Sequence, residues 1–160
     1  MSGIGQPERL TQQRVIALFQ DELAYRYLGD WSDRPGNSNI EEGLLSDYLR
    51  RAGYLEAQIS RALDLLRQDA HHPGRSLYDN NKAVYERLRY GVPVKVEAGK
   101  VTESVQLIDW QAPEKNDFAL ADEVTLRAAH VDAHERRPDI VLYLNGIAIG
   151  VLELDRKSVV

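Results

Sequence analysis

Apolar residues recur every three or four positions through the amino-terminal half of the chain, which is the spacing of one face of an α-helix. We predict helices over residues 7–28, 41–51, 56–70 and 78–90. Gly29, Gly53 and Gly91 follow three of these segments and are expected to end them. The stretch between the first two helices is dense in Asp, Ser, Pro, Gly and Asn, which is typical of an exposed loop.

The pattern changes to strand spacing after residue 91. We predict strands over residues 92–97, 101–109 and 118–126, then a hairpin close to the carboxyl end, with polar connectors at 113–116 and 128–137. Helices followed by strands indicate an α+β fold with a mixed β-sheet. We expect a single domain or fragment over residues 1–160, with a mainly helical part (1–91) and a sheet part (92–160).

The last hairpin has acidic residues on its apolar strands. Asn145-Gly146, flanked by Ile, Val and Leu, is a strong hairpin signal. A two-residue loop would place Asp139 opposite Leu152 and turn Glu153 to the other face. A three-residue loop would pair Asp139 with Val151, with Glu153 as its diagonal neighbour on the same face. We predict the three-residue loop.

Two carboxylates on one face of a rigid hairpin form an oxygen site of the kind that Mg²⁺ uses in phosphodiester hydrolysis. A purely structural interpretation is also open, in which Asp139 caps a strand after Pro138 and Glu153 points to solvent. The spacing alone does not decide between them.

Composition narrows the class of protein. With 160 residues, 43% of them hydrophobic and 28% charged, the chain suits one compact domain. It has no cysteine, which excludes disulfides and cysteine-based zinc or redox sites, and it lacks a secretory signal, so we expect a cytoplasmic protein without a membrane span. A net charge of -5 argues against a stand-alone, non-specific DNA binder.

Five stretches of the sequence form a set of motifs: Gly5-Gln6-Pro7-Glu8-Arg9, Tyr25-Arg26-Tyr27-Leu28-Gly29-Asp30-Trp31, Gly36-Asn37-Ser38-Asn39-Ile40-Glu41-Glu42, Ser76-Leu77-Tyr78-Asp79-Asn80-Asn81-Lys82 and Asn116-Asp117-Phe118. Together they resemble the amino-terminal region of the R subunit (HsdR) of type I restriction-modification enzymes, and this likeness covers nearly the whole chain. Pro138-Asp139, the hairpin and Glu153 also resemble the PD-(D/E)xK nuclease signature.

The resemblance implies a restriction-endonuclease-like core that hydrolyses double-stranded DNA with Mg²⁺, for which Mn²⁺ can substitute. It also implies methyltransferase (M) and specificity (S) subunits as partners. ATP would be used only by motor domains outside this chain, which has no Gly-x-x-x-x-Gly-Lys-Ser/Thr phosphate loop. Later elements normally complete such a core, whereas this chain ends seven residues after Glu153, so we expect a fragment truncated at its carboxyl end.

The resemblance assigns roles to individual residues. Asp139 and Glu153 would bind the metal, and the motif lysine would orient the attacking water. Asp155 occupies that lysine position, which reverses the charge that faces the phosphate. We expect Asp155 to inactivate the site; Lys157 is a second-ranked substitute, because two residues along a strand is about 6.6 Å and a local bulge would be needed.

Other candidates have competing interpretations. Arg136 and Arg137 precede Asp139 and could hold a DNA phosphate, although pairing with Glu135 is equally compatible. His130 and His134 have a zinc-compatible spacing on a helix, but a solvated loop is favoured and we assign no zinc.

We also expect structural rather than functional roles for the acidic and aromatic residues near the second predicted helix. Glu41 and Glu42 precede that helix, and we interpret them as acids that stabilise its dipole rather than as metal ligands. Tyr25, Tyr27 and Trp31 could stack on bases, but we expect core or interface roles.

Two functions from different classes therefore remain. The first is the endonuclease portion of a type I restriction enzyme R subunit. The second is a non-catalytic docking module that keeps the fold and binds the methyltransferase, specificity and motor components. Asp155, the acidic charge and the early carboxyl end favour the second for the isolated chain.

Overall fold

The computed structural model describes residues 6–97, 99, 101–126 and 136–154. Its contacts divide the chain into two compact units. Unit 1 contains Met1–Glu41 and Asp117–Val160, and unit 2 contains Glu42–Asn116. The expectation of one domain over residues 1–160 stays a prediction.

Helices and strands alternate more than the sequence pattern indicates. In the described part of the chain the elements are, in order, α1 (Gln6–Asp21), β1 (Arg26–Asp30), α2 (Glu42–Arg51), α3 (Glu56–Ala70), α4 (Leu77–Tyr90), β2 (Val92–Val94), β3 (Glu103–Val105), the 3₁₀ helix η1 (Pro113–Lys115), β4 (Phe118–Asp122), β5 (Ile140–Leu144) and β6 (Ile147–Leu152).

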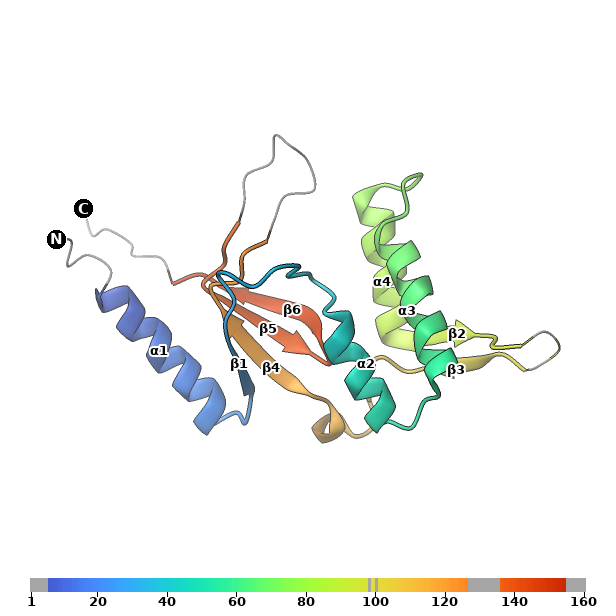
Figure 1. Ribbon diagram of the computed structural model, residues 1–160, viewed down its shortest axis with the longest axis horizontal. Helices are drawn as coiled ribbons and strands as arrows, with labels where there is room; N and C mark the ends of the chain where they lie inside the picture. Colours follow the sequence, from blue (N-terminus) through green and yellow to red (C-terminus); the bar gives the residue numbers. More distant parts are fainter. Residues whose placement is uncertain (1–5, 98, 100, 127–135, 155–160) are drawn as a thin grey trace. The chain divides into compact units, whose positions relative to one another are not determined.

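Unit 1 is built on a mixed sheet with the strand order β1-β4-β5-β6 (Figure 1). β1 pairs with β4 in parallel, whereas the β4–β5 and β5–β6 pairs are antiparallel. Helix α1 packs on this sheet, and Ile16 of α1, Leu120 of β4 and Ile140 of β5 form a buried cluster. The predicted α+β class with a mixed sheet is confirmed, and the more specific PD-(D/E)xK core stays a prediction.

The first predicted helix is too long. Helix α1 ends at Asp21, and residues 26–28, assigned to it from their periodicity, lie in β1 instead. The chain reverses at Ala24, whose φ is +56°, and Tyr27 then pairs with Leu120 of β4. Gly29, expected to end the helix, lies in β1 with a φ of +105°, where the β1–β4 register is irregular. Pairing with a strand far along the chain overrides the local helical pattern.

The final hairpin exists as predicted, but its loop is different. Asn145 and Gly146 form a two-residue turn with φ values of +52° and +84°, and Leu144 pairs with Ile147 across it. The predicted three-residue loop is therefore wrong. The extra residue lies farther along β6, because Tyr143 pairs with Ala148 while Leu142 pairs with Gly150. Ile149 is the bulged residue.

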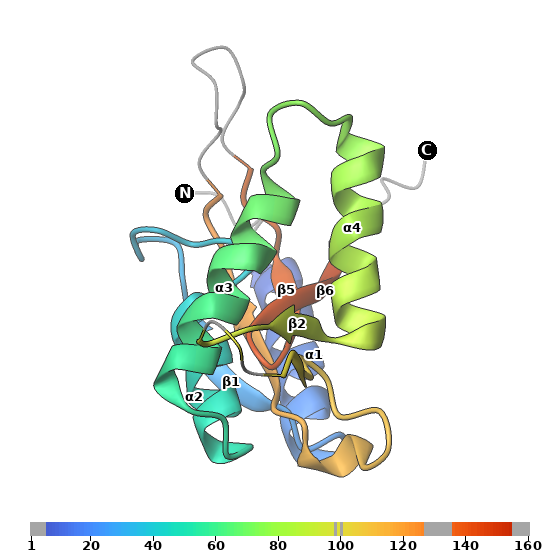
Figure 2. The same ribbon diagram turned by 90° about the vertical axis from the view of Figure 1, so that its right-hand side faces the viewer.

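Unit 2 contains α2, α3, α4 and the separate two-stranded β2–β3 sheet (Figure 2). The predicted bounds of α3 match the structure, and α2 and α4 differ from their predictions by one residue at the start. Ser76 caps α4 by accepting a hydrogen bond from the Asp79 amide, and Gly91 ends the helix with a φ of +84°. The strands β2 and β3 are shorter than predicted and do not belong to the larger sheet.

None of the helices in the described ranges is both long and apolar enough to cross a bilayer.

Candidate functional site

Asp139 and Glu153 lie next to the last paired residues of the β5–β6 hairpin. Ile140 pairs with Leu152, so continuing this register by one step places Asp139 directly opposite Glu153. The bulge at Ile149 produces this arrangement, since an unbulged two-residue hairpin would put Asp139 opposite Leu152. Opposite residues of an antiparallel pair point to the same face with Cβ atoms about 5 Å apart.

The surroundings of the two acids differ. Asp139 is half-buried and its Oδ2 accepts a hydrogen bond of 2.5 Å from the Leu154 amide, while Glu153 is exposed. The amide contact restrains the Asp139 carboxylate. Two carboxylates on one face fit the hard oxygen ligands that Mg²⁺ prefers.

No group of three His, Cys, Asp or Glu side chains that could hold a metal occurs among the described residues. Mg²⁺ is commonly held by one or two carboxylates, with water and substrate oxygens completing its shell, so a pair is compatible with such a site. Asp155 and Lys157, at and after the motif lysine position, lie outside the described residues, as do His130 and His134.

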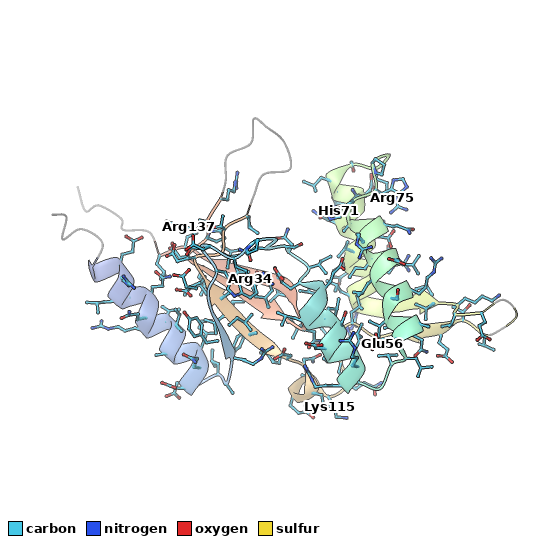
Figure 3. The ribbon with its side chains drawn as sticks, in the orientation of Figure 1. Arg34, Glu56, His71, Arg75, Lys115 and Arg137 are labelled. Carbon is cyan, nitrogen blue, oxygen red and sulfur yellow. The ribbon has the colours of Figure 1, made fainter. Side chains whose placement is uncertain are left out.

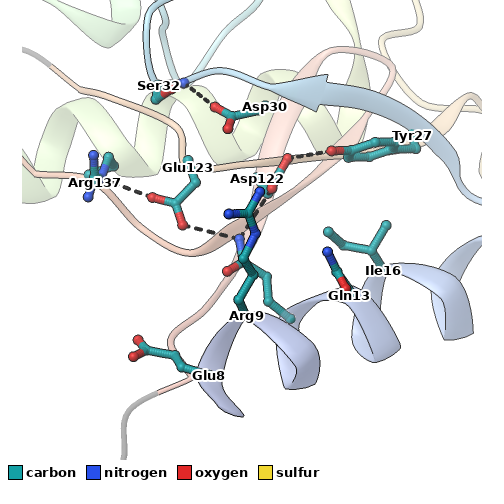
Figure 4. A pocket seen from close by; sticks show the side chains of 11 residues that line it. Glu8, Arg9, Gln13, Ile16, Tyr27, Asp30, Ser32, Asp122, Glu123 and Arg137 are labelled. Atoms are coloured by element: carbon teal, nitrogen blue, oxygen red, sulfur yellow. Dashed lines mark hydrogen bonds and ion pairs between the residues drawn. The ribbon is translucent and has the colours of Figure 1, made fainter. Parts of the chain in front are cut away.

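A polar cleft of about 510 Å³ lies between α1 and the ends of β1 and β4 (Figure 4). Its walls contain four carboxylates, two arginines and several polar side chains. The residues that line it are Glu8, Arg9, Gln12, Gln13, Ile16, Tyr27, Asp30, Ser32, Asp122, Glu123 and Arg137.

Gln12 connects this cleft to Asp139. Its side chain is buried, with 7% exposure, and its Nε2 lies 3.2 Å from Asp122 Oδ2, 3.2 Å from Glu123 Oε1 and 3.3 Å from the Asp139 carbonyl oxygen. A buried amide that donates to these groups holds α1 against the ends of β4 and β5. The main chain at Asp139 is therefore positioned by α1.

Tyr27 forms the opposite wall and donates a 2.7 Å hydrogen bond to Asp122 Oδ1. Burial, the hydrogen bond to Asp122 and the negative charges of Asp122 and Asp30 raise the pKa of Tyr27 to about 12. Hydrogen bonds from Ser32 are the main cause that lowers the pKa of Asp30. At neutral pH the Tyr27 hydroxyl therefore stays protonated and donates a hydrogen bond to Asp122.

Glu123 adopts a backbone conformation that is rare for a residue with a side chain, with a φ of +51°. Its amide donates to the Asp139 carbonyl at 3.0 Å, and its carboxylate lies 3.0 Å from Arg137 Nε. Strained residues of this kind cluster at functional sites. Arg137, expected at a DNA phosphate, therefore has Glu123 as its partner while remaining 58% exposed.

A comparison with known protein families identifies the family of the chain. The family model for the "Type I restriction enzyme R protein N terminus" matches residues 5–159. The chain belongs to this HsdR amino-terminal family. This family is the amino-terminal part of the R protein of type I restriction enzymes.

A curated relative supports the assignment of this HsdR family member. The putative type I restriction enzyme MjaIXP endonuclease subunit of Methanocaldococcus jannaschii is 36% identical over 74 residues, which are 45% of this chain and 7% of that protein. The chain thus spans a small part of the length of that relative. No solved structure matches the chain.

Glu41 lies at the other end of the hairpin in this HsdR chain. It is buried and pairs at 2.8 Å with Arg34, which is labelled in Figure 3. The neighbouring Ile40 bridges to Ile147 beside the turn. Glu42 lies in the first turn of α2, as expected of an acid at a helix start. Within unit 1, the Glu41 amide donates to the Gly146 carbonyl at the turn, so Glu41 lies at the opposite end of the hairpin from Asp139.

Two of the three aromatic residues of the HsdR motif pack as expected, whereas Tyr27 is 38% exposed and lines the polar cleft instead. Trp31 is buried, 5.5 Å from the ring of Tyr143, and the Arg34 guanidinium lies 4.0 Å from its ring centre. Tyr25 lies between the rings of Phe19 and Phe118.

Sequence reasoning did not find Gln12, Asp122 or Glu123. Gln12 is one of many polar residues on a surface helix, and the acids end a strand that was predicted to continue to residue 126. Their proximity depends on packing between segments more than a hundred residues apart, for which the single sequence contains no local signal.

Proposed function

We propose that this chain is the endonuclease portion of a type I restriction enzyme R protein, which hydrolyses phosphodiester bonds of double-stranded DNA with Mg²⁺. The observation that supports the proposal most strongly is the Ile140–Leu152 pair, because one further step of that register puts Asp139 opposite Glu153. Membership of the HsdR family and the strained, hydrogen-bonded main chain at Glu123 next to Asp139 support it further.

In this proposal Asp139 and Glu153 hold the metal. Bound Mg²⁺ would activate a water molecule and neutralise charge on the phosphate. The Leu154 amide fixes one oxygen of Asp139, and Gln12 and the Glu123 amide fix its carbonyl. Arg136 and Arg137, whose side chains are exposed, would attract the DNA backbone beside the site, with Arg137 exchanging Glu123 for a phosphate.

Asp155 replaces the positive group that would stabilise charge at phosphorus, so the cleavage activity of this chain is expected to be low. Lys157 is the alternative source of an ammonium group. We further propose that methyltransferase and specificity subunits find the target sequence and that ATP acts through motor domains outside this chain.

The test is cleavage of supercoiled plasmid in Mg²⁺ or Mn²⁺ by the chain and by Asp155→Lys. Restoring one charged group at a developing negative charge is expected to raise the rate about 100-fold. Asp155→Ala is the matched control, since it removes the negative charge without adding a positive one and should recover less.

Adding Asp139→Ala to Asp155→Lys should abolish the recovered cleavage. Cleavage that is unchanged by Asp155→Lys, or that persists without Asp139, would contradict the proposed site. Lys157→Ala in the unaltered chain then tests the alternative lysine, because residual cleavage should disappear only if Lys157 substitutes.

Asp155 itself favours a second candidate, a docking module that binds the other subunits without chemistry. This candidate predicts assembly with the methyltransferase and specificity subunits and no cleavage by Asp155→Lys. In the endonuclease proposal Asp139→Ala leaves assembly unchanged and removes only cleavage, so measuring both properties on the same variants separates the two.

A further inference from the structure

One face of α4 presents an aromatic and cationic stripe to solvent. Tyr78, Lys82, Tyr85 and Arg89 are spaced four, three and four residues apart, which places them on one side of the helix. All four are exposed, the two tyrosines by 74% and 63%. We call these four residues the α4 stripe. Single exposed tyrosines are ordinary, but their alternation with cations along one helix face is not.

The two cations of the stripe have no carboxylate partner in the part of the chain that the structure describes. The neighbouring Arg87, on the inner side of α4, pairs with Asp69 at 2.8 Å. Arg67 and Arg75 of the same unit are also paired. The two stripe cations therefore differ from these three arginines, each of which is neutralised by an ion pair.

Arg89 is held in a way that suits phosphate binding. Its guanidinium lies 5.4 Å from the ring centre of Trp110, and the Trp110 indole N–H donates to the Leu88 carbonyl at 2.9 Å. A guanidinium over a ring uses its flat face for the aromatic contact and keeps its N–H edge available for an anion. Trp110 is itself 49% exposed.

The stripe ends at a second cleft, of about 590 Å³, within unit 2. Arg89 and Trp110 line it together with the exposed Tyr90 and the half-buried Tyr54. An aromatic-walled cleft beside a cationic stripe is suited to a flat ring attached to a phosphate backbone, because every base offers a π-face for stacking.

We propose that the α4 stripe and its adjoining cleft bind the sugar–phosphate backbone of nucleic acid, with the cleft receiving an unpaired base when the strand is single. Tyr, Lys and Arg all contact phosphates, and Trp and Tyr provide stacking surfaces. A protein interface fits less well, because interface cores are depleted in lysine and Lys82 lies between the two tyrosines.

The charge distribution agrees with this surface. Acidic and basic residues are equal in number within Glu42–Asn116, so the net charge of -5 belongs entirely to the remaining segments. Unit 2 is thus the less repulsive half of the chain for a polyanion. The proposal does not depend on the Asp139 site and would survive its failure.

The test is an NMR titration of the ¹⁵N-labelled chain with a 12-nucleotide single strand and with the corresponding duplex, in EDTA. We expect shifts at the stripe amides with both probes and at the Trp110 indole chiefly with the single strand. Shifts confined to unit 1, or no shifts with either probe, would overturn the proposal.

Affinity is then measured by fluorescence anisotropy over a range of salt concentrations for Lys82→Ala/Arg89→Ala. Removing two phosphate contacts should weaken binding about tenfold and reduce the slope of log K against log salt by about 2. The matched control is Arg61→Ala/Lys95→Ala, which removes two exposed cations of the same unit and should change neither quantity beyond a small general effect.

Tyr85→Leu separates stacking from charge, since it should weaken single-strand binding while leaving the salt slope unchanged. Equal losses of affinity in the stripe and control variants would mean that nucleic acid is attracted by the overall charge and not by the stripe, which would contradict the proposal. Circular dichroism and thermal unfolding of each variant confirm that the exposed substitutions leave the fold intact.

Discussion

At the scale of single residues, hydrogen bonds to buried or strained groups position the candidate site. Gln12 and the Glu123 amide both hold the Asp139 carbonyl, and the Leu154 amide holds its carboxylate. Tyr27 adds a fixed donor to Asp122 on the other side of the cleft. Each contact joins segments that are distant in sequence, so they restrain Asp139 only in the folded chain.

The raised pKa of Tyr27 leads to a prediction about alkaline stability. The pKa of Tyr27 is about 12 in the folded chain, against 10 in the unfolded chain. Tyr27 therefore contributes fully to the free energy of unfolding below pH 10, and this contribution is lost as the pH rises from 10 to 12. Tyr27→Phe should cost about 1 kcal/mol at pH 8 through the lost hydrogen bond to Asp122.

The difference in free energy of unfolding between the unaltered chain and Tyr27→Phe should then shrink above pH 10. Urea unfolding from pH 8 to pH 11 measures this difference. Burial also raises the pKa of Tyr143, which is present in both proteins and cancels in the comparison. A difference that stays constant or grows through this range would contradict the assignment.

At the scale of elements, local patterns predicted what local physics determines. The bounds of α3 and the Asn-Gly turn follow from periodicity and from residues that tolerate positive φ. β1 was missed because Arg26–Asp30 becomes a strand by pairing with β4, some ninety residues later in the chain. The bulge at Ile149 likewise has no local signal, and it decides which residue faces Asp139.

The turn itself gives a prediction at this scale. Asn145 is fully buried with a φ of +52°, and its Oδ1 accepts the Asp117 amide at 2.6 Å. Asn145→Ala should lower the free energy of unfolding by about 2 to 3 kcal/mol, because the Asp117 amide loses its acceptor and alanine disfavours positive φ. Denaturant unfolding measures the loss.

Two variants at the same position divide this cost. Asn145→Asp keeps an acceptor for the Asp117 amide and should lose the least stability. Asn145→Gly removes the strain of positive φ and should lose only the stability that the hydrogen bond provides. Equal stability of the alanine variant and the unaltered chain would mean that the turn does not fix the hairpin register.

At the scale of the whole molecule, family membership and geometry support one account from different directions. The HsdR family model covers residues 5–159, and continuing the observed hairpin register by one step puts Asp139 opposite Glu153, an arrangement that the sequence did not indicate. The resemblance names the same two acids as metal ligands, which stays a prediction. It indicates neither the cleft around Gln12 nor the α4 stripe, which depend on packing within each unit. Asp155, at the motif lysine position, is where this sequence differs from the nuclease motif.

Calorimetric titration of Mn²⁺ into the chain, beside Asp139→Ala and Glu153→Ala, tests the central claim directly, because metal binding requires neither partner subunits nor the motif lysine. The control is Asp47→Ala, an exposed acid of α2 in unit 2. We predict binding by the unaltered chain and by the control, and its loss in both site variants. Binding that survives either site variant, or no binding by the unaltered chain, would contradict a metal site formed by these two carboxylates.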